Sequence, residues 1–180
     1  MAIQEITQIG SPITNNDISW FEDAIGGRLP AAYRRFLLKY NGGRPKPYYT
    51  HELALSIFYG IKPTKKMYDL LVNCRRMQKW LPKDVIPIGQ DTFGNEICLA
   101  VKGKNRGKLY FWDHEGAPDG ADMAVKYPMI VFNEGEDEPE PTIWPGNPDL
   151  VLIADSFTEF LDDFHEFIPD EPKVKRKRPK

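Results

Sequence analysis

The sequence predicts a single α+β domain with a mainly antiparallel central sheet, flanked by two N-terminal helices, one middle helix and one C-terminal helix. Four segments carry apolar side chains at three- and four-residue spacing between helix caps, the pattern of amphipathic helices. Between residues 85 and 113, short runs rich in strand-forming residues alternate with turns rich in glycine and asparagine. A length of 180 residues suits one domain with its own core.

The first predicted helix follows an irregular lead-in at residues 1–13. Thr14 and Asp17 have the spacing of a capping box, which predicts a helix over residues 15–25. Gly26 and Gly27 favour the backbone conformation that ends a helix, so we expect the helix to stop there.

The second predicted helix spans residues 30–41 and begins at Pro30, which fits a first helical turn because its missing N–H is not needed there. The run Asn41-Gly42-Gly43 ends it, since asparagine and glycine accept the left-handed cap conformation. Its buried face is predicted to hold Tyr33, Phe36, Leu37 and Tyr40.

A loop, two strands and a third helix are predicted next. Residues 44–47 are expected to form the loop, and residues 48–50 and 53–58 the strands. An apolar stripe at helical spacing predicts a helix over residues 65–79, which Leu81-Pro82 ends.

An antiparallel meander follows, with strands over residues 85–89, 96–102 and 108–113. The last strand carries large apolar side chains on both faces, so we expect it to be covered on both sides. Asp91, Gly94 and Asn95 mark the first turn. They lack the carboxylate density of a calcium loop, and a turn in which side chains bind the local backbone is the favoured interpretation.

Residues 114–149 are predicted to be an irregular insertion, with one short strand at 129–132. Ser156 and Glu159 form a capping box that opens the final helix. The last ten residues are basic, and their composition predicts a disordered tail. The buried face of the final helix is expected to hold Phe157, Phe160, Leu161 and Phe164.

Net charge is −2, but it is unevenly distributed. Residues 171–180 hold six basic groups and one acidic group, so without them 18 basic and 25 acidic residues give −7. An acidic body argues against nucleic acid as the main partner and favours a basic protein.

No catalytic, cofactor or metal motif is found. His51, His114 and His165 lie far apart, and Cys74 and Cys98 are expected to be reduced thiols in or near the core of a cytoplasmic protein. No apolar run approaches the length of a membrane span. We therefore expect a protein that is not an enzyme and binds neither cofactor nor membrane.

The strongest candidate for partner binding is the acidic run at residues 134–140. A solvated loop is the simpler interpretation, but the run can also attract a basic partner. Trp112 and Trp144 are candidate anchors if they are exposed, and Asp113 is adjacent. The candidate acidic contact residues are Glu134, Glu136, Asp137 and Glu138.

In order along the chain, several short motifs together resemble the SUKH superfamily, in the branch described in a yeast cell-wall-assembly regulator. The resemblance implies one domain over residues 1–170, with an insertion at about 115–149 that departs from the pattern. The matching residues mark caps, turns and core. The signature residues are Leu29, Pro30, Tyr33, Phe36, Asn41, Gly42, Asp91, Gly94 and Asn95.

The resemblance also implies a function. Many bacterial members look like immunity proteins that bind and neutralise a cognate toxin, often a nuclease or deaminase. The alternative is an intracellular scaffold or regulatory interaction module of the yeast type. In both readings the protein acts by binding another protein.

Overall fold

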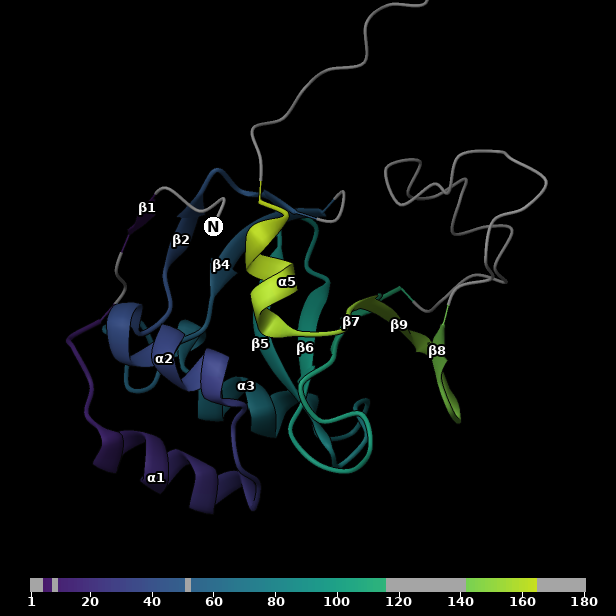
Figure 1. Cartoon of the computed structure of the whole chain (residues 1–180), viewed down its shortest axis with the longest axis horizontal. Coiled ribbons are helices and arrows are strands. Elements are labelled where there is room, and N and C mark those ends of the chain that lie inside the picture. The colour runs from purple at the N-terminus through teal and green to yellow at the C-terminus, as the bar shows by residue number, and fades with distance from the viewer. Residues whose placement is uncertain (1–4, 8–9, 51–52, 116–141, 165–180) are drawn as a thin grey trace, which may run out of the picture.

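A seven-stranded antiparallel sheet in the order β3-β4-β5-β6-β7-β9-β8 organises the protein (Figure 1). The computed structural model describes residues 5–7, 10–50, 53–115 and 142–164. The predicted α+β class with a mainly antiparallel sheet is confirmed. The strands are β3 (Tyr49–Thr50), β4 (Leu53–Phe58), β5 (Val85–Asp91), β6 (Glu96–Ala100), β7 (Leu109–Trp112), β8 (Ile143–Trp144) and β9 (Asn147–Ala154).

The described residues contain four α-helices: α1 (Asn15–Ile25), α2 (Ala31–Tyr40), α3 (Leu70–Met77) and α5 (Phe157–Asp162). The predicted third helix over 65–79 is too long. Asp69 has an extended backbone and its side chain accepts a hydrogen bond from the Val72 N–H, so α3 begins after it. Lys66–Tyr68 form a separate 3₁₀ turn.

A two-stranded sheet joins segments predicted to be irregular. Strand β1 (Glu5–Thr7) pairs with β2 (Arg44–Lys46), and Ile6 lies opposite Pro45. Both side chains are buried while their neighbours are exposed. Three residues per strand are too few to give a periodic signal, which explains why the sequence predicted a lead-in at 1–13 and a loop at 44–47.

The predicted irregular insertion extends too far, because regular structure begins again before its predicted end at residue 149. Residues 143–154 form the hairpin of β8 and β9, so regular structure resumes before residue 149. Pro145 and Gly146 make the turn, where Gly146 has a φ of 79°. The predicted strand at 129–132, the acidic run at 134–140 and the basic tail lie outside the described residues.

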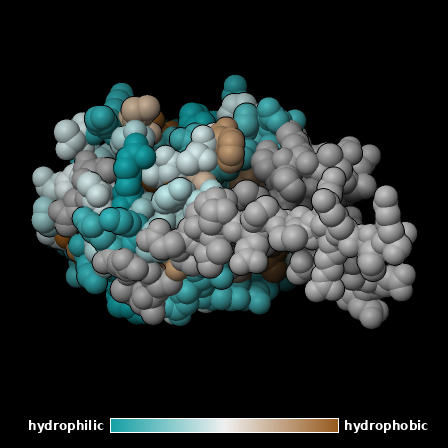
Figure 2. All heavy atoms as spheres, turned by 90° about the horizontal axis from the view of Figure 1, so that it is seen from above, coloured by the Kyte–Doolittle hydropathy of each residue, from teal (hydrophilic) through white to brown (hydrophobic). Residues whose placement is uncertain are grey.

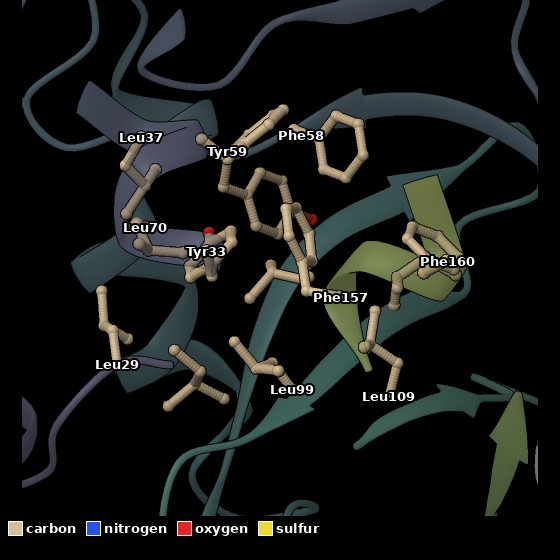
Figure 3. Close-up of a cluster of buried hydrophobic side chains, with 14 of the residues drawn as sticks. Leu29, Tyr33, Leu37, Phe58, Tyr59, Leu70, Leu99, Leu109, Phe157 and Phe160 are labelled. Carbon is tan, nitrogen blue, oxygen red and sulfur yellow. The ribbon is translucent and has the colours of Figure 1, made fainter. Parts of the chain in front are cut away.

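The main core lies on the sheet face that α2 and α5 cover (Figure 3). Phe157 of α5 is its centre, with its ring centroid 4.9 Å from Tyr33 and 5.2 Å from Phe36 of α2. Leu99 of β6 and Leu109 of β7 supply the sheet side. The helices are therefore held by aromatic packing onto alternate residues of the central strands.

A smaller core lies on the opposite face. Cys98 and Ala100 of β6 and Tyr110 and Trp112 of β7 alternate with residues of the main core. They pack with Met77, Leu81, Val85 and Leu150. Both faces of β7 are buried, as its sequence predicted.

Asn41 and Gly42 directly follow α2, and both contact the chain at and just after the end of β4. Asn41 has a φ of 50°, and its side chain donates to the carbonyls of Ser11 and Ile61 at 3.0 and 2.9 Å. It also accepts from the Ile61 N–H at 2.7 Å. A Cβ on Gly42, at a φ of 81°, would lie 2.8 Å from the carbonyl oxygens of Phe58 and Tyr59.

We expect Gly42→Ala to lower the free energy of unfolding by about 2–4 kcal/mol, because left-handed strain adds to a backbone clash. Gly146→Ala is the matched control: its φ is 79° and nothing lies within 4 Å of the added Cβ. The control should cost only the backbone strain, about 1–2 kcal/mol. Urea unfolding measures both, and equal losses would contradict the clash.

Candidate functional site

Four aromatic side chains form a cluster on the second face of the sheet, here called the tryptophan cluster: Trp80, Tyr110, Trp112 and Trp144. Trp144 packs edge-on against Tyr110 with ring centroids 5.1 Å apart. The rings of Trp80 and Trp112 are 6.3 Å apart. Strand β7 places Tyr110 and Trp112 two residues apart and therefore on the same face.

Hydrogen bonding fixes the outer members of the cluster. Trp80 lies after α3, and its carbonyl accepts a hydrogen bond from the Asn147 side chain at 2.9 Å. This bond ties the α3–β5 connection to the β8–β9 hairpin. Trp144 is held in the same hairpin by the pairing of β8 with β9. These contacts hold the two segments that carry Trp80 and Trp144 next to each other.

The members of this cluster and their neighbours differ in how much of each side chain is exposed to solvent. Trp80 is 53% exposed and Ile143, next to Trp144, is 47% exposed. Trp144 is half-buried, whereas Trp112 and Asp113 are buried. The sequence named Trp112, Asp113 and Trp144 as partner contacts, but Trp112 and Asp113 are buried, and Trp112 packs against Trp80.

Trp80 and Ile143 were not identified from the sequence. Trp80 follows the predicted helix and lies outside its apolar stripe, and this position is the one signal that could have marked it as exposed. Where Figure 2 shows described residues, the surface is mostly hydrophilic with small separate hydrophobic areas. The large exposed apolar side chains among the described residues are Trp20, Tyr48, Met67, Trp80, Phe93 and Ile143.

The predicted acidic contacts Glu134, Glu136, Asp137 and Glu138 lie outside the described residues. Strand β7 ends at Trp112 and β8 begins at Ile143, so the chain leaves and re-enters the described fold beside the tryptophan cluster. Residues 116–141 carry seven acidic groups and one basic group, whereas the described residues hold 17 basic and 15 acidic groups. The acidic excess is therefore local and does not belong to the described fold as a whole.

The signature residues of the second helix are structural. Leu29, Tyr33 and Phe36 are buried in the main core, and Pro30 directly precedes α2. Glu22 of α1 fixes this junction by accepting from the Leu29 N–H at 2.9 Å and from Arg34 at 2.7 Å. Burial alone would raise the pKa of Glu22, but bonds from Arg28, Arg34 and Leu29 outweigh it and lower that pKa.

Asp91, Gly94 and Asn95 build the β5–β6 turn. One carboxylate oxygen of Asp91 accepts from the N–H groups of Phe93 and Asn95, both at 2.8 Å. The other accepts from the Asn95 side chain at 2.8 Å, and Gly94 has a φ of 98°. Both carboxylate oxygens of Asp91 are therefore engaged in hydrogen bonds within the turn. In the described part of the chain, no group of three metal-ligating side chains occurs.

A buried polar group links α3 to the sheet. Glu96 is fully buried, and its carboxylate accepts from the Tyr59 hydroxyl at 2.9 Å and from the Arg76 guanidinium. Arg76 also donates to Asn73 at 3.0 Å. Burial raises the pKa of Glu96 and the bonds from Arg76 and Tyr59 oppose that effect. The network joins Asn73 and Arg76 of α3 to Glu96 of β6 and so ties the helix to the sheet.

The two cysteines are free thiols, as predicted. Burial raises the pKa of both Cys74 and Cys98, which disfavours the reactive thiolate. Neither is therefore set up as a nucleophile. Within the described ranges, no helix is long and apolar enough to cross a membrane.

The elements define an α+β domain with a mainly antiparallel sheet. The chain belongs to the SMI1/KNR4 family (SUKH-1), whose model matches residues 12–163, and this confirms the resemblance seen in the sequence. Members of the family are generally non-enzymatic immunity or regulatory domains. A similar protein is the SPbeta prophage-derived uncharacterized protein YokK of Bacillus subtilis (strain 168). It is 31% identical over 171 residues, covering 82% of this chain and 72% of YokK.

Proposed function

We propose that this protein is an immunity protein that binds and neutralises a bacterial toxin, such as a nuclease or deaminase, in the cytoplasm. Membership of the SMI1/KNR4 family supports a binding role. Similarity to a prophage-derived bacterial protein favours the immunity reading over the yeast-type regulatory one. The observation that carries the proposal is the exposed side chain of Trp80, which packs against Trp112 in the tryptophan cluster.

The physical case rests on what binding hot spots require. Tryptophan is enriched among residues that dominate interface energy, since it buries a large area at a low cost in conformational entropy. The indole of Trp80 packs against Trp112, and its backbone carbonyl accepts the bond from Asn147, so part of its position is fixed before a partner binds.

The acidic groups of residues 116–141 have a separate role in this proposal. They attract a basic toxin over a distance and raise the association rate, while the apolar contacts at Trp80 slow dissociation. Glu134, Glu136, Asp137 and Glu138 join the described fold at the edge of the tryptophan cluster through residues 115 and 142. A toxin bound there would have its active site covered by this surface.

We expect Trp80→Ala to weaken binding of the toxin encoded beside this protein's gene by at least about 30-fold, the size of a hot-spot loss. Stability should change little because Trp80 is 53% exposed. Surface plasmon resonance measures the dissociation constant, and growth of cells expressing both proteins measures neutralisation.

The control is Trp20→Ala on α1, which removes a tryptophan that is 46% exposed and lies outside the cluster. It should leave binding unchanged. Equal losses in the two variants would remove the tryptophan cluster from the interface. If the unaltered protein neither retains the neighbouring toxin nor relieves its toxicity, the immunity function is wrong.

A further inference from the structure

A cavity of about 420 Å³ opens between the end of α1, helix α3 and the start of β5. Leu81, in the connection from α3 to β5, lines this cavity and also packs in the smaller core. Its apolar lining comes from all three elements. The residues of this lining are Ala24, Ile25, Leu71, Cys74, Leu81, Pro82, Val85 and Ile86.

Three cations, Arg75, Lys83 and Lys102, and the amide of Gln78 form the rest of the lining. No carboxylate lines the cavity, and none of the three cations forms an ion pair with another described residue. The side chain of Lys102 passes close to the end of α1, where a Cβ on Gly27 would lie 3.0 Å from its Cε.

The segment that supplies most of the lining is basic as well. Residues 62–108 hold eleven Lys and Arg and four Asp and Glu. Three of these cations, Lys62, Arg76 and Lys108, are paired with Asp17, Glu96 and Asp155, and the others still leave an excess of positive charge. Like charges gathered around one cavity repel, which destabilises the free protein. A bound anionic group relieves that repulsion, so the electrostatics select a negatively charged occupant.

The floor of the cavity selects for apolar groups. Leu71, Val85 and Ile86 lie at its base, and the Cys74 thiol stays neutral because burial raises its pKa. The charged ends of Arg75 and Lys83 stand on long exposed side chains rather than in fixed, buried positions. A small ligand needs precisely placed polar groups to orient it, whereas adaptable cations around an apolar floor suit a protein segment.

We propose that this cavity is a second protein-docking site, which takes an acidic segment of a partner in which Leu or Phe adjoins Asp or Glu. The apolar side chain enters the floor and the carboxylates pair with Arg75, Lys83 and Lys102. The site is opposite in charge to the one proposed for a basic toxin. It does not depend on the immunity function.

The test uses the full chain and a fluorescein-labelled hexapeptide with Leu-Phe at its centre and two acidic residues on each side. Fluorescence polarisation should show binding that weakens as salt rises and is lost when the acids become amides. The double variant Arg75→Glu/Lys83→Glu should bind about 10-fold more weakly, from two reversed rim charges. Ala24→Trp fills the cavity mouth from α1 and should weaken binding without any change of charge.

Lys65→Glu/Lys104→Glu is the matched control, with the same charge change at exposed lysines outside the cavity lining. Equal weakening in both double variants would mean non-specific attraction and would overturn the proposal. So would full competition by free phosphate or citrate at the peptide's concentration, which indicates a small-anion site. A dimer that Arg75→Glu/Lys83→Glu dissociates would assign the cavity to a second copy of this chain instead. Toxin binding by Trp80→Ala tests the other surface separately.

Discussion

Replacing Arg76 with Met should lower the free energy of unfolding by about 2–3 kcal/mol at neutral pH. Breaking a fully buried ion pair costs about 3–5 kcal/mol because one charge is left without its partner. Arg76 is 48% exposed, so water reaches the vacated side of Glu96 and reduces the penalty. The Tyr59 hydroxyl remains as a donor to the carboxylate.

The loss should depend on pH. Burial already raises the folded-state pKa of Glu96 above its ordinary 4.5, and removing Arg76 raises that pKa further. A raised folded pKa means that the folded state binds this proton more tightly than the unfolded state does. The resulting stability is present below about 4.5 and is lost as pH rises through the folded pKa. The Arg76→Met substitution should therefore lower the free energy of unfolding more at pH 8 than at pH 5.

Urea unfolding at the two pH values measures this difference. Arg75→Met serves as the control, since Arg75 is the neighbouring exposed cation with no ion pair among the described residues. Adding Glu96→Gln to Arg76→Met should recover part of the loss at pH 8 by removing the buried charge. A loss that is equal at pH 5 and pH 8 would show that Glu96 is not its source.

Phe157→Ala should be the most damaging of these substitutions, at about 3–5 kcal/mol, the range for truncating a buried phenylalanine. Phe157 lies between α2 and the sheet, with its ring 4.9 Å from Tyr33 and 5.2 Å from Phe36 (Figure 3). It is also the first residue of α5, so its loss removes the contact that holds the C-terminal helix to α2.

Phe157→Leu retains most of the buried volume and should cost less than about 1.5 kcal/mol. Thermal unfolding followed by circular dichroism ranks the two variants. Similar losses would mean that ring stacking, rather than filled volume, holds α5. A loss below 1 kcal/mol for Phe157→Ala would show that α5 contributes little to the core.

Local signals account for the parts of the fold that the sequence predicted well. Thr14 and Asp17 form the expected capping box, and Ser156 caps α5 as its spacing predicted. These features depend on residues within four positions of each other. The pairing of β1 with β2 depends instead on residues about forty positions apart, and three-residue strands carry no pattern of their own.

The candidate surface was harder to predict for a related reason. Alternation in residues 108–113 indicated that Tyr110 and Trp112 share a face, and the structure agrees. Which tryptophan is exposed depends on what packs over that face. Met77 and Leu81 arrive from α3 and its connection, and they bury Trp112 while Trp80 is left at the rim. A single sequence contains no record of that packing.

The direct pairing of β7 with β9 has a consequence for how such proteins diversify. The ladder from Trp112 to Leu150 joins directly two strands that lie far apart in sequence. Doubling the length of a connecting segment costs only about 0.6 kcal/mol in closure entropy. Insertions and deletions there leave the sheet register unchanged. Partner choice can therefore evolve at this junction almost independently of folding.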